Sequence, residues 1–146
     1  MKRLIALPLL LLSLCSFADE FRIDYGITGS WYNPDLPGQG FSLEVVPHTK
    51  QFVAYWFTFQ VESGEQRWLL GQGTYEDNIA VTNVIEPVGG TFVQSEGITA
   101  EQWGSAVFRF SSCANGTVEF ASENNGSDTF NIVRITDNVA CQGGSK

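Results

Sequence analysis

Beyond its N-terminal segment, the chain alternates apolar and polar residues with a period of two. No window of useful length shows the spacing of an amphipathic helix. The pattern predicts eight or nine short strands separated by turns rich in Gly, Asn, Asp and Pro. The candidate strands are Thr28–Asn33, Gly40–Val46, Gln51–Gln60, Gln66–Gly71, Ile79–Ile85, Gly90–Val93, Ser105–Ser111, Thr117–Ala121 and Thr129–Thr136.

The turns between these strands are mostly short. Asn115-Gly116 and Asn125-Gly126 are Asn-Gly pairs, which favour the left-handed backbone of tight hairpins. The sequence therefore predicts an all-β domain, a single antiparallel meander of about eight strands. Such a sheet hides its edges by closing into a barrel or by folding over as a sandwich, and the strand pattern leaves both open.

The segment Gln51–Gln60 is apolar on both faces of its predicted strand. Val53, Tyr55 and Phe57 alternate with residues that are also apolar, including Trp56. One face must enter the core. The other needs a ligand, a partner subunit or another packed segment to cover it.

Two arginines interrupt apolar strands. Arg109 lies between two phenylalanines, and Arg134 lies between Val133 and Ile135. Alternation places each arginine on the face opposite its neighbours. We interpret both as outward and solvated.

The N-terminus has the pattern of a secretory signal. Lys2 and Arg3 precede the apolar run Leu4–Leu14, which is too short to remain as a membrane anchor. Small residues near Ala18 predict cleavage before Asp19. The expected organisation is a signal peptide over residues 1–18 and a single all-β domain over 19–146. No second apolar run follows, so we predict no membrane span and a periplasmic or secreted location.

A lipoprotein is the alternative for the same segment. Leu12–Cys15 resembles a lipobox, which would make Cys15 the lipidated N-terminus. However, Leu14 is bulky where a lipobox usually has Gly, Ala or Ser. We therefore favour cleavage after Ala18.

Removal of the signal leaves two cysteines, Cys113 and Cys141. An even pair in an exported chain predicts a disulfide. Two free buried thiols are the alternative, which an oxidising compartment disfavours.

The chain is acidic, with 16 Asp and Glu against 8 Lys and Arg. A nucleic-acid partner needs a basic face to neutralise phosphates, so this balance argues against one. Binding to anionic lipid is disfavoured for the same reason. The acidic excess fits solubility, and it also suits a cationic ligand or partner.

The residues that usually carry catalysis are scarce. His48 is the single histidine, which is weak support for a triad or a zinc site. There is no phosphate-binding loop, and no carboxylate pair stands out among the acidic residues for glycoside hydrolysis. We predict no catalytic residue, no metal site, no cofactor and no enzyme activity, with a hydrolase using an acidic pair as a weak alternative.

Most of the mature chain resembles a domain found in secreted proteobacterial proteins. The likeness rests on Gly29–Pro34 followed by Gly38–Glu44, on a Trp-rich hairpin over Tyr55–Leu69, and on the segment from Phe110 to Cys141. No activity is established for that family. The resemblance implies the domain boundary and the disulfide, and it leaves the function open.

A second, local likeness is to avidins. Gly26–Asn33 is similar to their first strand and Gly126–Phe130 to their last. The resemblance implies an eight-stranded barrel of avidin or lipocalin type, with Asn33 and Asp128 holding the ureido group of biotin. Trp68 lies too early relative to Asp128 for the avidin pattern, and Pro34 stands where avidins have their binding turn.

Aromatic residues make up 13% of the chain, and rings can line a binding pocket as well as fill a core. We therefore predict a non-catalytic binding module for a small ligand, in which rings stack on the ligand and Asn33 and Asp128 fix its polar groups. The candidate ligand-binding residues are Trp31, Asn33, Tyr55, Trp56, Trp68 and Asp128.

Two other functions stay open. The strand 51–60 could form a protein interface, which would make the chain an inhibitor-like interaction or assembly subunit, or a homo-oligomer. An avidin-like biotin binder is the third hypothesis. The sequence names neither the ligand nor the oligomeric state.

Overall fold

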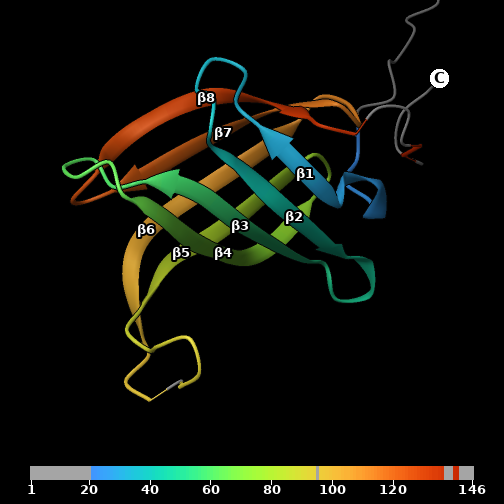
Figure 1. Cartoon of the computed structure of the whole chain (residues 1–146). Coiled ribbons are helices and arrows are strands. Elements are labelled where there is room, and N and C mark those ends of the chain that lie inside the picture. Colours follow the sequence, from blue (N-terminus) through green and yellow to red (C-terminus); the bar gives the residue numbers. More distant parts are fainter. Residues whose placement is uncertain (1–20, 95, 137–139, 142–146) are drawn as a thin grey trace, which may run out of the picture.

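The computed structural model describes residues 21–94, 96–136 and 140–141. The predicted signal peptide and Cys15 lie outside these residues. Eight strands run antiparallel in sequence order, and the last pairs with the first to close a barrel (Figure 1). They are β1 (Gly29–Tyr32), β2 (Gly40–Val46), β3 (Gln51–Phe59), β4 (Gln66–Glu76), β5 (Ile79–Val88), β6 (Thr99–Phe110), β7 (Asn115–Ser122) and β8 (Gly126–Arg134). The predicted all-β closed barrel is confirmed.

The barrel has two different ends. One end, which we call the sealed end, carries the connections 47–50, 77–78 and 111–114 and the N-terminal segment 21–28. The other, which we call the mouth, carries the connections 33–39, 60–65, 89–98 and 123–125.

Segment 21–28 closes the sealed end. It contains the short 3-10 turn η1 (Tyr25–Ile27), and it buries the side chains of Phe21, Ile23 and Ile27. Its backbone is held in place where Ile23 donates a 2.7 Å hydrogen bond to the carbonyl of Asp77. The barrel interior is therefore not open to solvent at this end.

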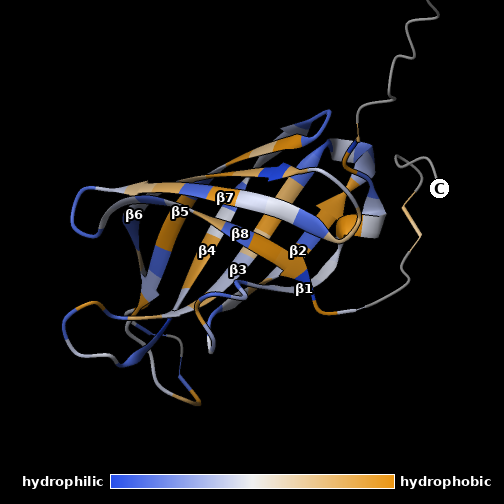
Figure 2. Cartoon of the chain, turned by 90° about the horizontal axis from the view of Figure 1, so that it is seen from above, coloured by the Kyte–Doolittle hydropathy of each residue, from blue (hydrophilic) through white to orange (hydrophobic). Residues whose placement is uncertain are grey.

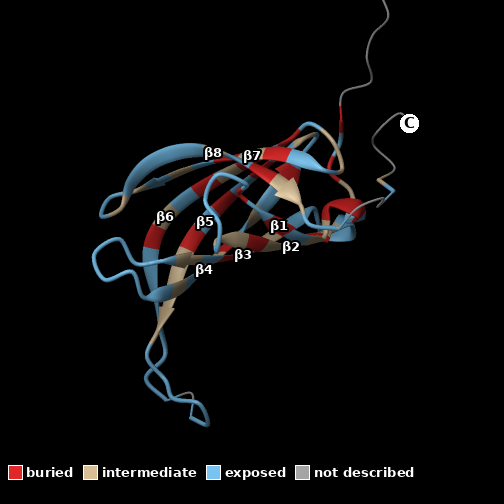
Figure 3. Cartoon of the chain, turned by 45° about the horizontal axis from the view of Figure 1, so that its top comes forward, coloured by how far each residue is buried: buried red, intermediate tan, exposed pale blue. Residues whose placement is uncertain are grey.

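The interior above this plug is filled with rings. Phe108 packs against Phe41 and Phe52, with ring centroids 5.3 and 5.1 Å apart, and Trp31 meets Phe110 edge-on at 5.2 Å. Hydrophobic and hydrophilic residues alternate along the strands (Figure 2), and most buried residues lie within the strands (Figure 3). Alternation with one buried face is what an antiparallel barrel requires.

The predicted strand Gly90–Val93 is not a strand. These residues belong to connection 89–98, which projects from the barrel (Figure 1) and contains an isolated bridge between Thr91 and Gln94. Phe92 and Val93 are exposed, so no neighbouring strand or core surface holds them in a sheet. These residues have a local preference for a strand, but they do not form one because no sheet or core surface lies beside them.

The interpretation of Arg134 as solvated is also wrong. Arg134 lies on the same side of β8 as the buried Ile132, its Nε atom is buried, and its guanidinium donates to the carbonyls of Gly26 and Thr28. Arg109 is outward as predicted, 3.7 Å from Glu119.

The predicted disulfide between Cys113 and Cys141 is present. It links the β6–β7 connection to the chain that follows β8. Cys141 also lies against segment 21–28, because a Cβ on Gly26 would be 2.7 Å from its Sγ. The bond therefore ties together three pieces of the sealed end.

Across the described ranges, no helix has the length and apolar character needed to cross a membrane.

Candidate functional site

The mouth of the barrel holds a pocket of about 310 Å³. Its floor is aromatic, and its rim comes from the β1–β2 and β3–β4 connections and the β7–β8 turn. The lining residues are Leu36, Gln39, Trp56, Thr58, Phe59, Gln60, Val61, Arg67, Leu69, Trp103, Phe120, Asn125, Asp128 and Phe130. This volume lies at the small end of the range for ligand pockets, roughly 300–1,000 Å³.

Four rings from four strands form the floor. Trp56 on β3 meets Trp103 on β6 and Phe120 on β7, each with ring centroids 5.3 Å apart and in edge-to-face geometry. Phe130 on β8 completes the group, 6.0 Å from both Trp56 and Phe120. Inward alternation along β3, β7 and β8 brings Trp56, Phe120 and Phe130 to this floor, where the four rings separate the packed interior from the mouth.

Trp103 reaches this floor through an irregularity in β6. Val84 pairs with Gly104, whereas Ile85 pairs with Gln102, so Trp103 is the extra residue of a β-bulge. A bulge re-aims a side chain, and glycine at 104 makes room for it. A Cβ there would lie 2.1 Å from the carbonyl oxygen of Ala121.

Both floor tryptophans have an unsatisfied indole N–H. Trp56 and Trp103 are only 6% and 9% exposed, and neither Nε1 atom has a hydrogen-bond partner among the described residues. In contrast, Trp31 in the filled half donates to the carbonyl of Ile27 over 2.9 Å. A buried donor without an acceptor costs about 1–3 kcal/mol, so two of them at one pocket require an explanation.

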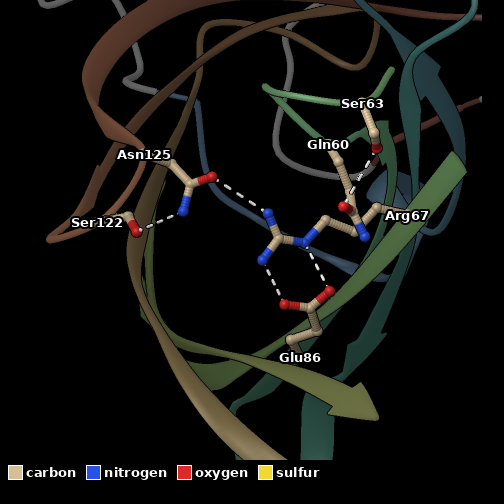
Figure 4. Close-up of polar contacts among 6 residues, drawn as sticks. All are labelled: Gln60, Ser63, Arg67, Glu86, Ser122 and Asn125. Carbon is tan, nitrogen blue, oxygen red and sulfur yellow. Dashed lines mark hydrogen bonds and ion pairs between the residues drawn. The ribbon is translucent and has the colours of Figure 1, made fainter. Parts of the chain in front are cut away.

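A polar bridge crosses the mouth above this floor (Figure 4). Arg67 on β4 makes a two-pronged ion pair with Glu86 on β5, including Nε to Oε1 at 2.6 Å, and its Nη1 donates to Asn125 Oδ1 over 3.1 Å. The Asn125 amide in turn donates to Ser122. Because the Arg67 and Glu86 side chains are only 15% and 17% exposed, the pair is held in place and its charges cancel locally.

Asp128 is the other charged residue of the lining. It lies on β8 opposite Phe120, and its Oδ1 accepts a 2.7 Å hydrogen bond from the amide of Thr129. Among the described residues, no lysine or arginine forms an ion pair with it. With Arg67 neutralised by Glu86, Asp128 gives the pocket lining a net negative charge.

The six sequence-predicted binding residues are dispersed. Trp56 and Asp128 line the pocket. Trp31 lies deep in the filled half, and the buried Asn33 side chain accepts from the amide of Asp35 in the β1–β2 connection. Tyr55 and Trp68 point outward from β3 and β4, where both are exposed.

Sequence reasoning missed several lining residues, above all Trp103, Phe120, Phe130 and Arg67. Phe120 and Phe130 lay within predicted strands but were not singled out. Trp103 lay before the predicted strand Ser105–Ser111, so alternation could not orient it. The Trp103-Gly104 pair is the one signal of a bulge that the sequence carries.

Other candidate chemistry lies away from the mouth. His48 is exposed in the 3-10 turn η2 (Pro47–Thr49) at the sealed end. Within the part of the chain that the structure describes, no group of three metal-ligating side chains occurs. A larger outer depression of about 450 Å³ near Arg109 and Asn131 contains none of the unpartnered buried donors.

Comparison of the chain with protein-family models, curated proteins and solved structures finds no significant match. The likenesses to a secreted proteobacterial domain and to avidins therefore stay predictions.

Proposed function

We propose that this protein is exported and acts as a non-catalytic binding module that holds a small ligand in the mouth pocket. The observation that carries the proposal is the contrast between the two halves of the barrel. The half next to the sealed end is filled with rings, whereas the half next to the mouth keeps a 310 Å³ space over an aromatic floor. A space lined by rings, with a few converging polar groups, is the usual form of a small-ligand site.

The rigidity of the site supports the same function. The floor residues come from paired strands, and the bridge from Arg67 to Glu86 and Asn125 fixes the rim before any ligand arrives. A preformed site loses little conformational entropy on binding.

Tryptophan fluorescence tests the proposal, because two of the four tryptophans form the floor. The measurement uses the Trp68→Phe variant, which lacks the outward indole. We expect one or more members of a panel of sugars, biotin-like heterocycles and short peptides to cause a saturable change in its tryptophan fluorescence. Thr58→Phe, which places a ring in the mouth, should abolish that change. Val81→Phe adds the same ring on the exposed outer face of β5 and should preserve it.

A flat response across the panel contradicts the proposal. So does a response that Thr58→Phe leaves unaltered, because the ligand would then bind elsewhere.

A protein interface is the second candidate function, and one observation favours it. Phe57 and Trp68 pair across β3 and β4 on the outer face, and they are 53% and 47% exposed. Tyr32 and Tyr55 extend this exposed aromatic face. Exposed rings gathered on one sheet face are typical of interaction surfaces.

A further inference from the structure

The connections around the mouth are acidic. They carry no lysine or arginine, and their five carboxylates belong to Asp35, Glu62, Glu65, Glu96 and Glu123. All five residues are exposed, and none of them forms an ion pair with a basic side chain among the described residues. The connections of the sealed end carry both signs, on Arg22, Asp24, Lys50 and Asp77. The two ends of the barrel therefore differ in charge, and the field at the mouth attracts cations.

Asp128 carries negative charge into the pocket itself. It lies one inward position from Phe130 on β8 and directly opposite Phe120 on β7, and all three residues line the pocket. The Cβ atoms of such opposed residues are about 4.5–5.5 Å apart, so the carboxylate lies beside the rings. Arg67, the basic residue of the described lining, is held by both carboxylate oxygens of Glu86. It therefore does not neutralise Asp128.

The rings supply the apolar part of a cation site. Phe130 stacks on Phe41 of the packed interior, with ring centroids 6.0 Å apart and an angle of 24° between the planes. One face of Phe130 is used in that contact, so the opposite face is turned away from the interior, toward the pocket that this ring lines. The face of an aromatic ring attracts a cation that lies within about 6 Å of the centroid, and a nearby carboxylate adds to that attraction.

A metal ion does not suit this arrangement. Hard cations such as Ca²⁺ take about six to eight oxygen ligands. The described lining contains one carboxylate, and the described part of the chain has no group of three metal-ligating side chains. An organic ammonium ion needs one counter-charge, and it also gains from contact with rings. The volume of about 310 Å³ admits such an ion together with apolar substituents on its nitrogen.

We infer that the mouth pocket takes a compact organic ammonium ion. The charged nitrogen lies between the carboxylate of Asp128 and the rings of Phe120 and Phe130, and its apolar substituents fill the space over the floor. The acidic connections raise the concentration of this cation at the mouth. This inference rests on the proposed function, because it names the ligand class of the same pocket.

Three phenols that differ in the charge of one head group test the inference by calorimetric titration of the mature protein. (4-Hydroxyphenyl)trimethylammonium is cationic, 4-tert-butylphenol is a neutral compound of the same shape, and 4-hydroxybenzenesulfonate is anionic. A slightly acidic buffer keeps all three phenol groups protonated. We expect the ammonium compound to bind about tenfold more tightly than 4-tert-butylphenol, and the sulfonate to bind more weakly than either. A purely apolar pocket would prefer 4-tert-butylphenol, because the neutral head group loses less hydration on entry.

Matched variants locate the effect. Asp128→Asn removes the charge at nearly constant shape, so it should weaken binding of the ammonium compound about fivefold and change the affinity for 4-tert-butylphenol by less than about twofold. Glu119→Gln removes an exposed carboxylate on the outer face of β7 and should leave the preference unaltered. Phe130→Leu keeps an apolar side chain without a ring and should reduce the preference about threefold. Far-UV circular dichroism verifies that each variant is folded, and the wild-type comparison stands even if a variant is not.

The outcomes separate the ligand class from the proposed function. Equal or tighter binding of 4-tert-butylphenol or of the sulfonate overturns the ammonium class. So does a preference that Asp128→Asn lowers no more than Glu119→Gln does. If Thr58→Phe abolishes the binding in these cases, the pocket itself stands. If none of the three phenols binds, the ammonium class falls, and the proposed function falls with it when the wider panel gives no response either.

Discussion

The guanidinium carbon of Arg134 lies 5.6 Å from the ring centroid of Trp31, inside the sealed end of the barrel. The two residues pair between β8 and β1, so this contact lies at the seam where the sheet closes. Arg134 also donates to the carbonyls of Gly26 and Thr28. Burial lowers the pKa of its guanidinium, which nevertheless stays charged at neutral pH. One side chain thus joins the last strand, the first strand and the N-terminal plug.

Replacing Arg134 should therefore destabilise the whole domain. Arg134→Met removes the cation–π contact and leaves two inward carbonyls without their donor, so we expect a loss of about 2–4 kcal/mol in the free energy of unfolding. Urea titration followed by tryptophan fluorescence measures it. Arg109→Met is the matched control, since its exposed ion pair with Glu119 should contribute no more than about 0.5 kcal/mol. Equal losses in both variants would contradict the structural role of Arg134.

Arg134 and Trp103 show what the alternation of apolar and polar residues could and could not predict. Alternation and turn chemistry sufficed for the antiparallel all-β meander, because most strands bury one face and connect through short turns. They left the choice between a barrel and a sandwich open, and the likeness to avidins favoured the barrel. Alternation gives only relative orientation, however. It placed Arg134 opposite Val133 and Ile135 but could not say which side was the interior. Trp103 depends on a bulge, and a single inserted residue reverses every orientation that follows.

The pocket was harder to predict for a related reason. Trp31 and Trp56 both point inward, but Trp31 packs on Phe110 in the filled half, whereas Trp56 lines the mouth pocket. Which half a ring occupies depends on how the sheet closes and on the plug formed by segment 21–28, neither of which local pattern specifies. The sequence therefore indicated that rings gather inside, without indicating at which level the filling ends.

The ion pair at the mouth should be a strong structural link. Arg67→Met strands the Glu86 carboxylate in a largely buried position, and we expect a loss of roughly 3 kcal/mol in unfolding free energy. The double variant Arg67→Met/Glu86→Leu should recover most of that loss, because no charge is then left unpaired. Chemical denaturation of the single and double variants checks this. A double variant no more stable than Arg67→Met would mean that the pair acts through packing.

The disulfide should contribute substantially to stability. It closes a loop between positions separated by 28 residues, for which the chain-entropy model gives about 3–4 kcal/mol. We expect the Cys113→Ser/Cys141→Ser variant to unfold at a correspondingly lower urea concentration than the wild type. Adding a reductant should lower the wild-type midpoint to that of the variant and leave the variant unchanged. A reductant effect of similar size on the double variant would show that it acts on something else.

Stability at alkaline pH should depend on Tyr75. Burial raises the pKa of its phenol, and the charge of Asp24 adds to the shift. Below pH 10 the phenol is neutral in both folded and unfolded chains. Above it, the unfolded chain releases the proton first, so stability falls as pH rises toward the higher pKa of the folded state. Between pH 9 and about 11, the urea midpoint of Tyr75→Phe should fall less steeply than that of the wild type. Parallel curves for the two proteins would contradict the shift.

The outer aromatic face offers a way to separate the two candidate functions. Because Phe57 and Trp68 point away from the pocket, Phe57→Ser/Trp68→Ser should leave ligand affinity within about twofold of wild type. The exposed pair contributes only about 0.2–1 kcal/mol to the fold, so the variant should remain folded. Sedimentation velocity of both proteins then reports on the face itself. If the wild type self-associates and the variant is a monomer, the face is an interface between copies. If both are monomers of equal ligand affinity, the face is not an interface between copies, and ligand binding does not depend on it.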